Sequence, residues 1–414
     1  LEFRTGRGIC NYVNGQDLSR YSQVGVVTPD HTIRTKNWPM VLPPPEASNL
    51  AVYSQEVKKC VDRYVRRYHR YFTRHNGKRE VEKIELDPYP RVILIPGVGL
   101  FGAGKSVKEA RIAADIAENT IEVITDAEAI GRYRPVSEAD MFDIEYWALE
   151  QAKLAIDEEL PLSRQIVVVT GGGSGIGAAT AQAFAGAGAV VAVLDKDTNS
   201  AQRIGKAIGG GSIGINCDVT DHSSVRQAFD RVCREFGGID IVVSNAGAAW
   251  QGCIGTVSER ILRQSFELNF FSHQTVAQNA VRVMSAQGTG GALLFNASKQ
   301  AINPGKDFGP YGLPKAATLF LARQYALEYG DQGITANVVN ADRVHTGLFK
   351  GGLLEVRAAA RGLSVDQYLR DSNLLKREVK AEDVAKAFVN LALSRRTTAA
   401  VMTVDGGNIE AALR

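Results

Sequence analysis

The chain from about residue 160 onward alternates short apolar runs with stretches of helical periodicity. The apolar runs, rich in Val and Ile, are predicted as seven strands: Gln165–Thr170, Ala189–Asp195, Ser212–Val219, Asp240–Gly247, Gly291–Ser298, Ile334–Asn340 and Ala400–Gly407. Amphipathic stretches between them, such as Ala178–Gly186 and Ser223–Phe236, are predicted as helices. Uninterrupted apolar runs are typical of strands buried on both faces of a parallel sheet. The pattern therefore predicts an α/β domain over residues 161–414, built on a doubly wound parallel sheet of the Rossmann type.

Residues 1–160 have a different pattern, in which charged and aromatic residues crowd together. The stretch Lys58–His75 is predicted as an amphipathic helix whose aromatic residues form its packing face, since Asp62 interrupts its basic residues. Helices are also predicted over Lys108–Glu122 and Glu138–Ile156, with little strand between them. We expect a smaller, incomplete α/β domain over residues 1–160, followed by a lead-in segment at Asp157–Arg164.

Composition and charge exclude several classes of protein. The 414 residues are 45% hydrophobic and 22% charged, which is typical of a globular chain. The formal charge of +3 gives no indication of a nucleic-acid or membrane partner, and no run approaches the roughly 18 apolar residues of a membrane helix. The five scattered cysteines favour a reducing, cytoplasmic location. The chain begins without Met, and we interpret it as a fragment or a processed form.

A glycine-rich motif, TGGGSGIG, joins the first predicted strand of this domain to the helix after it. Gly171, Gly175 and Gly177 allow a tight turn, a close approach of backbone to a pyrophosphate, and close helix packing. Ser174 and Ile176 lie between these glycines, where backbone N–H groups at a helix N-terminus bind phosphate. Such spacing predicts a dinucleotide site, with a purely structural turn as the alternative.

The second strand of this domain ends at Asp195, 18 residues after Gly177. A carboxylate at this place can bond both ribose hydroxyls and repels a 2′-phosphate, which favours NAD over NADP. Lys196 follows directly and weakens the inference.

Tyr311 and Lys315 form a Y-x-x-x-K pair, and Ser298 lies thirteen residues before the tyrosine. Positions i and i+4 share one face of a helix, so the phenol and the ammonium can approach one substrate together. A free tyrosine has a pKa of about 10, and a nearby ammonium together with an oxidised nicotinamide ring favours the phenolate. We expect Tyr311 to exchange a proton with the substrate oxygen, while Ser298 stabilises developing charge on that oxygen.

These motifs, with CDV (Cys217–Val219), NAG (Asn245–Gly247) and VDGG (Val404–Gly407), resemble the short-chain dehydrogenase/reductase family over roughly residues 163–414. The resemblance implies a catalytic group of Asn269, Ser298, Tyr311 and Lys315, with Asn269 positioning the lysine through water. It also implies further cofactor contacts, in addition to Tyr311 and Lys315, from Asp218, Val219, Asn245, Ala246, Gly247, Val344 and Thr346. A homodimer or homotetramer with a small-molecule substrate is typical of the family, and we expect one here.

Two segments depart from the family's pattern. The strand that carries the serine ends Asn296-Ala297-Ser298-Lys299, where Asn-x-Ser-Ser is usual. The sixth strand is followed by Asn340-Ala341-Asp342, where Asn-Pro-Gly is usual. Asp342, Arg343 and His345 either recognise a polar or anionic substrate or face solvent in a loop. Residues Gly347–Leu374, which have helical character and glycine hinges, are predicted as a substrate lid.

The N-terminal part contains a second glycine-rich motif, G-x-x-x-x-G-K-S, from Gly99 to Ser106. It formally fits a phosphate-binding loop of nucleotide hydrolases. The sixty residues after it show helices and no acidic strand end for Mg²⁺, so we favour a glycine-rich turn between a strand and a helix.

The segments VGVVTPDHTIRTKNWP and PRVILIPGVGLFGAGKS resemble the C-terminal half of a class II aldolase/adducin-type domain. This domain precedes a dehydrogenase in the bifunctional rhamnulose-phosphate aldolase/alcohol dehydrogenase family. The resemblance implies that His31 is a zinc ligand whose partners, two histidines and an acid, lie in a part that nothing here matches. We expect a truncated aldolase-like region that binds zinc only where the domain is completed; an unmetallated loop histidine is the alternative.

The leading hypothesis is an NAD-dependent oxidoreductase that transfers a hydride between the nicotinamide and a small alcohol or aldehyde, or a sugar-derived substrate such as lactaldehyde. Two alternatives stay open. One is a metal-dependent class II aldolase that acts on a sugar phosphate and is fused to the dehydrogenase. The other is a non-catalytic dinucleotide-binding protein.

Overall fold

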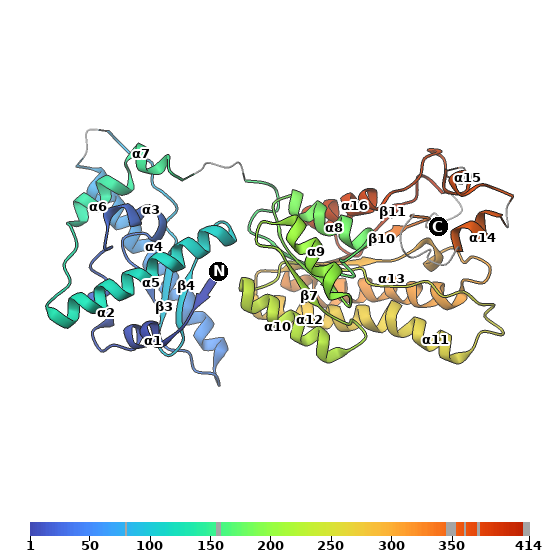
Figure 1. The fold of residues 1–414 in the computed structure, drawn as a ribbon, viewed down its shortest axis with the longest axis horizontal. Helices are drawn as coiled ribbons and strands as arrows, with labels where there is room; N and C mark the ends of the chain where they lie inside the picture. The colour runs from blue at the N-terminus through green and yellow to red at the C-terminus, as the bar shows by residue number, and fades with distance from the viewer. Residues whose placement is uncertain (79–80, 155–158, 345–352, 360–361, 371–372, 409–414) are drawn as a thin grey trace. The chain divides into compact units, whose positions relative to one another are not determined.

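The computed structural model describes all residues except 79–80, 155–158, 345–352, 360–361, 371–372 and 409–414. The chain divides into two compact units, Leu1–Glu158 and Glu159–Arg414 (Figure 1). Each unit is described by itself.

The second unit is built around a seven-stranded sheet in the order β11-β10-β9-β8-β5-β6-β7, in which every neighbouring pair is parallel. Its strands are β5 (Ile166–Thr170), β6 (Val190–Asp195), β7 (Ile213–Asn216), β8 (Ile241–Ser244), β9 (Gly291–Asn296), β10 (Ile334–Ala341) and β11 (Val401–Val404). Each lies within or next to a run predicted as a strand, so the predicted doubly wound parallel sheet is confirmed.

Helices cover both faces of this sheet because its central strands are apolar on both sides. Val167 and Val169 pack in one cluster with Phe184 and Phe388, while Val168 between them points to the other face. The helices of the first face are α8 (Gly175–Gly186), α9 (Thr198–Ile208) and α16 (Ala381–Leu393). Figure 1 shows α10 (His222–Phe236), α12 (Ser272–Gln287) and α13 (Gly309–Tyr329) along the other face.

Five of the remaining helical segments follow the carboxyl ends of the strands, on the expected substrate side: α11 (Glu259–Phe266), η2 (Glu267–Phe271), η3 (Lys299–Ala301), α14 (Leu353–Ala359) and α15 (Val365–Arg370). The short η4 (Gly330–Gln332) precedes β10 at the opposite ends of the strands. Leu354 and Ala358 of α14 pack on Tyr368 and Leu369 of α15 in a small apolar cluster. The helical character predicted for the lid segment is therefore confirmed in its described parts.

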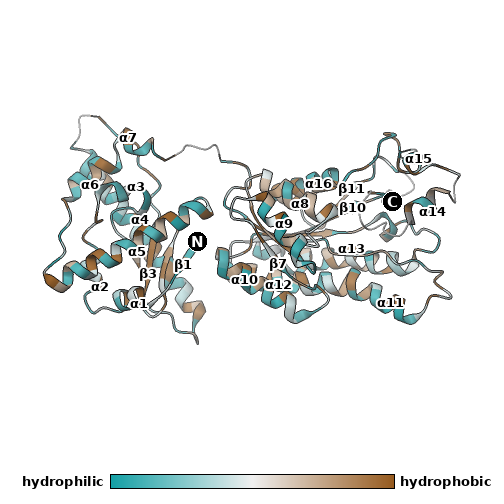
Figure 2. Cartoon of the chain, viewed as in Figure 1, coloured by the Kyte–Doolittle hydropathy of each residue, from teal (hydrophilic) through white to brown (hydrophobic). Residues whose placement is uncertain are grey.

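The first unit contains a four-stranded sheet in the order β1-β4-β3-β2. The strands are β1 (Glu2–Arg4), β2 (Met40–Val41), β3 (Val92–Ile95) and β4 (Gly99–Gly102), and only β2–β3 is parallel. The helices are α1 (Arg7–Val13), α2 (Leu18–Tyr21), η1 (Pro29–His31), α3 (Thr32–Thr35), α4 (Leu50–Asn76), α5 (Val107–Ile130), α6 (Glu138–Glu145) and α7 (Ala148–Gln151). Figure 2 shows hydrophobic residues along β3 and alternating hydrophilic and hydrophobic turns along α5, which buries one face on the sheet.

Two predictions for this unit need correction or refinement. The single helix predicted over Glu138–Ile156 is wrong, because the described part forms two short helices, α6 and α7, separated at Trp147. The helix predicted around Lys58–His75 is confirmed within the longer α4, and its buried residues Tyr64, Tyr68, Tyr71 and His75 form the packing face.

The glycine motif at Gly99–Ser106 forms a hairpin strand instead of a phosphate loop. Gly99–Gly102 is β4, paired antiparallel with β3, and Ser106 caps α5 by accepting a hydrogen bond from the Glu109 N–H at 3.2 Å. A Cβ at Gly102 would lie 2.7 Å from the backbone nitrogen of Ala114, so the glycine allows α5 to pack closely on the strand. The preferred prediction, a strand–helix turn, is confirmed for residues 103–106, whereas the first half of the motif is the strand itself.

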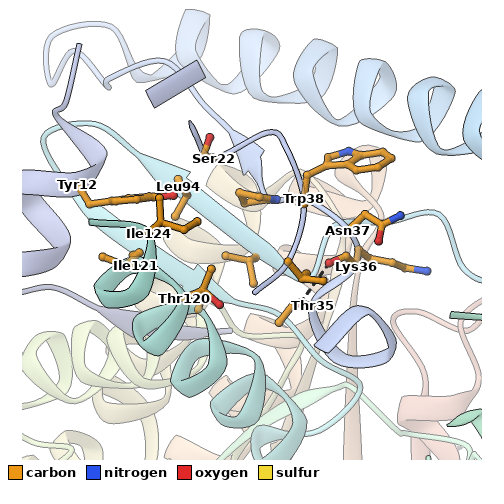
Figure 3. Close-up of a pocket in the computed structure, with 15 residues that line it drawn as sticks. Tyr12, Ser22, Thr35, Lys36, Asn37, Trp38, Leu94, Thr120, Ile121 and Ile124 are labelled. Carbon is orange, nitrogen blue, oxygen red and sulfur yellow. Dashed lines mark hydrogen bonds between the residues drawn. The ribbon is translucent and has the colours of Figure 1, made fainter. Parts of the chain in front are cut away.

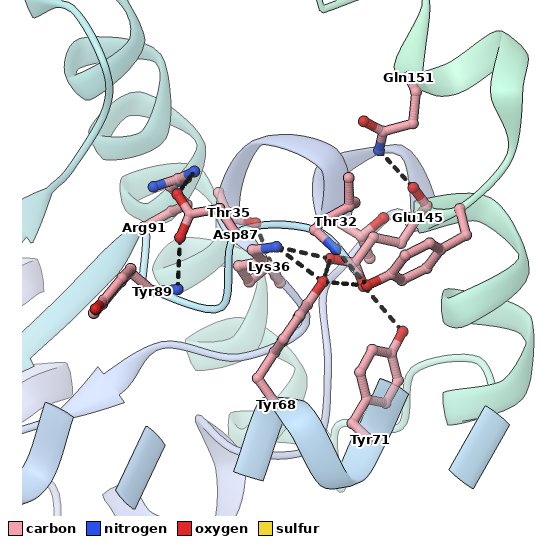
Figure 4. A network of polar contacts seen from close by, with 12 residues as sticks. Thr32, Thr35, Lys36, Tyr68, Tyr71, Asp87, Tyr89, Arg91, Glu145 and Gln151 are labelled. Atoms are coloured by element: carbon pink, nitrogen blue, oxygen red, sulfur yellow. Dashed lines mark hydrogen bonds and ion pairs between the residues drawn. The ribbon is translucent and has the colours of Figure 1, made fainter. Parts of the chain in front are cut away.

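A buried charged network holds α4, α6 and the segment before β2 together (Figure 4). The Lys36 ammonium lies 3.2 Å from a carboxylate oxygen of Glu145, and both side chains are almost fully buried. The hydroxyls of Tyr68 and Tyr71 donate to the two oxygens of the same carboxylate at 2.8 and 3.0 Å. Because the buried carboxylate is fully partnered, the cost of burying its charge is offset by these bonds.

All five cysteines are free thiols, as their scattered positions predict. Among the described residues, no helix is both long enough and apolar enough to cross a membrane.

Candidate active site

The glycine loop lies where the order of the parallel sheet reverses, between β5 and β8. In open α/β sheets, the crevice at the carboxyl ends of the strands on either side of such a reversal is where ligands bind. Gly171 and Gly175 have positive φ angles of 60° and 52°, which L side chains rarely adopt. A Cβ at Gly171 would also lie 2.9 Å from the Cα of Ala246, so the loops after β5 and β8 touch.

Gly177 allows helix α8 to pack directly on the loop that precedes it. A Cβ at this position would overlap the carbonyl oxygen of Gly171 and lie 2.7 Å from the side-chain nitrogen of Asn245. The tight turn and the close helix packing are therefore present at Gly171 and Gly177, and the approach of backbone to a pyrophosphate stays a prediction.

The N-terminus of α8 has the properties of an anion site. Ser174 occupies the N-cap, and among the described residues it makes no side-chain capping bond. By contrast, Asp197 caps α9 and Asp221 caps α10 with their carboxylates. The first turn of α8 thus offers backbone N–H groups and a partial positive charge where a pyrophosphate would sit, so the loop fits a dinucleotide.

Asp195 stands beside this loop at the end of β6. Its two carboxylate oxygens accept hydrogen bonds from the Gly173 N–H at 2.9 Å and the Asp197 N–H at 3.0 Å. An ionised carboxylate has about four lone-pair sites, so it retains acceptor capacity for ribose hydroxyls.

Two of the predicted cofactor contacts, Asp218 and Val219, follow β7. The Asp218 carboxylate accepts from the Thr220 N–H at 2.9 Å and from its hydroxyl at 2.7 Å, and these bonds lower the pKa of Asp218. Asp218 is exposed, and Val219 beside it is buried.

Asn245 connects three strands of the sheet below the site. Its side-chain nitrogen donates to the Thr170 carbonyl at 3.0 Å, and its side-chain oxygen accepts from Asn296 at 2.8 Å. The Thr170 hydroxyl in turn accepts from the backbone N–H groups of Asn245 and Ala246. Asn296, at the end of β9, is a structural partner that the sequence prediction did not assign.

The structure brings Ser298, Tyr311 and Lys315 together. Tyr311 and Lys315 lie one turn apart on α13, and the lysine Nζ is 5.9 Å from the centroid of the tyrosine ring. Ser298 follows β9 and hydrogen-bonds the Tyr311 hydroxyl. Gly247 lies against the same group, because a Cβ there would come within 3.4 Å of the Lys315 Nζ.

Burial dominates the electrostatics of this group. It raises the pKa of Tyr311 to about 12, although the hydrogen bond from Ser298 acts in the opposite direction. Burial also lowers the pKa of Lys315 to about 7, so the lysine is only partly charged at neutral pH. In the protein without a cofactor, burial therefore favours the protonated Tyr311, which is a proton donor. The phenolate predicted beside an ammonium and an oxidised nicotinamide ring stays a prediction for the complex with the cofactor.

Asn269 lies in a π-helical turn, η2, that connects α11 to α12. It is fully buried, and its side-chain nitrogen donates to the Ala248 carbonyl at 2.8 Å and to the Ser265 hydroxyl at 3.1 Å. Its backbone carbonyl accepts from the Thr318 hydroxyl on α13 at 2.9 Å. Asn269 thus fixes the loop after β8 and the helix of Lys315, and π turns of this kind are frequent at functional sites.

The sequence left open that Asp342 faces solvent in a loop, and for this residue that alternative is wrong. Its carboxylate is buried, pairs with the Lys299 ammonium at 3.1 Å and accepts from Asn408 at 2.9 Å. The Arg343 guanidinium stacks on the Tyr368 ring, 4.7 Å from its centroid. These contacts connect the residue after Ser298 with the segment after β10.

Val344 is buried, and its side chain packs in the core cluster of the first face. The predicted contact Thr346, together with His345, lies outside the described residues.

In the first unit, His31 ends η1 and is partly exposed. Its Nε2 lies 3.1 Å from the Thr28 hydroxyl, and its Nδ1 is buried without a hydrogen-bond partner among the described residues. Within the described part of the chain, no cluster of three or more His, Cys, Asp or Glu residues could hold a metal ion.

A cavity of about 40 Å³ lies between β3, α5 and the segment before β2 (Figure 3). Apolar side chains, among them Leu94, Ile121 and Ile124, line much of it. This volume has room for a few water molecules and not for a sugar phosphate.

Comparison with known proteins agrees with this geometry. Residues 171–408 match the family model described as enoyl-(acyl carrier protein) reductase, and residues 1–154 match the second domain of class II aldolases. A short-chain dehydrogenase/reductase of Mycobacterium marinum superposes with a TM-score of 0.55 at 30% identity, covering 60% of this chain and 96% of that one. The C-terminal unit is therefore an oxidoreductase with a Rossmann-type fold.

The chain belongs to the short-chain dehydrogenase/reductase family, with a class II aldolase domain before the dehydrogenase. It is 33% identical to the uncharacterized oxidoreductase YuxG of Bacillus subtilis over 96% of this chain, and it spans 60% of that protein's length. It is 32% identical to (+)-borneol dehydrogenase 1 of Salvia officinalis over 59% of this chain and 94% of that enzyme.

Replacing Gly177 with Ala should destabilise the second unit, because the added Cβ meets backbone that cannot move aside. We expect a loss of about 1–3 kcal/mol, the usual range for overpacking, measured by chemical denaturation. Gly186→Ala in the same helix is the control, since a Cβ there meets nothing within 4 Å. Equal stability of the Gly177→Ala protein and the unmodified chain would contradict the packing role.

Proposed function

We propose that residues 161–414 form an NAD-dependent dehydrogenase domain that uses Ser298, Tyr311, Lys315 and Asn269, and that residues 1–160 form the aldolase-like domain before it. The observation that carries the proposal is the contact of the half-buried Ser298 with the buried Tyr311, one helical turn from the buried Lys315, at the same sheet edge as the uncapped glycine loop. The proposed cofactor contacts are those predicted from the sequence.

The proposed reaction interconverts an alcohol and a carbonyl compound. When bound, the nicotinamide would supply or accept the hydride at the substrate carbon. In reduction, the protonated Tyr311 hydroxyl donates its proton to the carbonyl oxygen, which becomes the alcohol oxygen. Ser298 hydrogen-bonds that oxygen, and Lys315 stabilises the phenolate left on Tyr311. Oxidation reverses each step.

The proposed substrate is a small alcohol or aldehyde, or a sugar-derived compound such as lactaldehyde. The relative from Salvia officinalis is a dehydrogenase of borneol, which is an alcohol, and this similarity supports an alcohol or its carbonyl product as the substrate. A sugar-phosphate aldolase activity finds no specific support in the described residues, where His31 has no neighbouring cluster of metal-binding side chains.

Tyr311→Phe should reduce turnover about 10²–10⁴-fold, the usual contribution of a general acid–base group. The ring still packs, so the fold should persist. Steady-state NADH formation over a panel of small hydroxy-aldehydes and polyols measures the effect. Tyr325→Phe is the matched control, because Tyr325 is also buried on α13 but donates to Gln274. Near-normal turnover by Tyr311→Phe on a good substrate would overturn the mechanism.

Asp195→Ala should narrow the preference for NAD over NADP by about 1–3 kcal/mol, the value of one charged hydrogen bond. The carboxylate would bond the ribose hydroxyls and repel a 2′-phosphate. The ratio of kcat/KM for the two cofactors measures the change, and Asp195→Asn separates the charge from the size of the side chain. Better use of NADP than NAD by the unmodified protein would refute the assignment.

We also propose self-association through α13. Its exposed apolar residues Leu313, Phe320 and Leu327 are 48%, 68% and 79% exposed and are spaced by seven, so they form one stripe along the helix. Two-fold pairing would bury these stripes against each other. Light scattering at micromolar concentration should give a dimer or tetramer, and Phe320→Glu should lower the mass. Ile130→Glu, at an exposed apolar residue of the other unit, should not. A monomeric mass of the unmodified chain would contradict this proposal.

A further inference from the structure

Behind Lys315 lies a second buried titratable side chain, His273, which the mechanism above does not use. It is on α12, four residues after Asn269, and is completely buried. The Phe295 ring meets it edge-on at 6.3 Å. A histidine in such an apolar place needs partners for both ring nitrogens, because an unpaired buried polar atom is costly.

Both ring nitrogens have a partner. The Nδ1 lies 2.6 Å from the Ser244 hydroxyl at the end of β8, and the Nε2 lies 3.3 Å from the Lys315 Nζ. An ammonium only donates, so the Nε2 accepts from Lys315 and the ring proton is on the Nδ1. The Nδ1–H then donates to the Ser244 hydroxyl. Burial and the lysine both lower the pKa of His273, which agrees with a neutral ring.

His273 is the side chain that accepts a hydrogen bond from the Lys315 ammonium. The lysine also donates to the Asn296 backbone carbonyl at 2.8 Å, which leaves one N–H for the side of Tyr311. Among the described residues, the polar groups recorded against the lysine are His273 from α12, the Asn296 carbonyl from β9 and Tyr311 on α13 itself. No ion pair is recorded for Lys315 in the described part of the chain, so its charge depends on neutral acceptors.

We propose that His273, oriented by Ser244, is a positioning residue that keeps Lys315 in its ammonium form and aimed at Tyr311. The inference rests on the proposed function, because it matters only if Lys315 acts with Tyr311. Without the imidazole acceptor, a buried ammonium loses one of its few bonds, and the neutral amine is favoured. The lysine then loses its proton at lower pH, which removes the charge that Tyr311 needs.

The test is the pH profile of turnover for His273→Leu and His273→Gln. With leucine, the alkaline limb should move about one pH unit toward acid from the lysine's pKa of about 7. The loss of turnover relative to the unmodified enzyme should then rise from about twofold at pH 6 to about ninefold at pH 8. Glutamine offers an oxygen to Lys315 and an N–H to Ser244, so it should restore most of the profile. A merely structural role would scale the rate equally at every pH.

Each outcome either supports or overturns the positioning role of His273. A folded His273→Leu protein with an unshifted profile overturns the inference. If this variant does not fold, Ser244→Ala replaces it. A smaller shift of the alkaline limb in the same direction then supports the inference that Ser244 orients His273 toward Lys315, and an unshifted limb overturns it. Failure of the proposed function is distinguishable, because it would show as normal turnover by Tyr311→Phe whatever His273 does.

Discussion

The pairing of β5 with β8 is the constraint on which the rest of the second unit depends. These strands are neighbours in space although β6 and β7 lie between them in sequence, and their register joins Val167 to Ile241 and Val169 to Val243. Because all strands are parallel, this pairing brings the glycine loop after β5 and the Asn245 turn after β8 to one edge. The contact of Gly171 with Ala246 exists only at that reversal of strand order.

Burial then determines the chemistry of the residues gathered at this edge. The interior that raises the pKa of Tyr311 also lowers the pKa of Lys315, so desolvation pushes both groups toward their neutral forms. The bonds from Lys315 to the Asn296 carbonyl and to His273 act against this tendency. The Tyr311 hydroxyl is therefore a proton donor in the protein alone. The positive charge of an oxidised nicotinamide ring, when bound, would favour the Tyr311 phenolate.

The sequence was sufficient for elements whose signal is local. Short apolar runs predicted all seven strands of the parallel sheet, and the i, i+4 spacing placed Tyr311 and Lys315 on one helix face. It was not sufficient for polar contacts between distant elements. The bonds of His273 to Ser244 and Lys315 span 29 and 42 residues, and the pair of Lys299 and Asp342 has no periodicity that predicts it. The division of Glu138–Ile156 was missed because helical periodicity says little about where a short helix ends.

The two glycine motifs of this chain show why spacing alone cannot assign a phosphate site. Both follow a strand and precede a helix. After β4, which is antiparallel to its neighbours, the Ser106 hydroxyl accepts from the Glu109 N–H in the first turn of α5. The Glu109 carboxylate also accepts from the N–H of Lys105, just before the helix. After β5, in a parallel sheet, Ser174 leaves the first turn of α8 without a side-chain cap among the described residues. A helix N-terminus binds an anion only where its donors are not already bonded. The discriminating feature is therefore the cap, and the sequence shows a serine in both places.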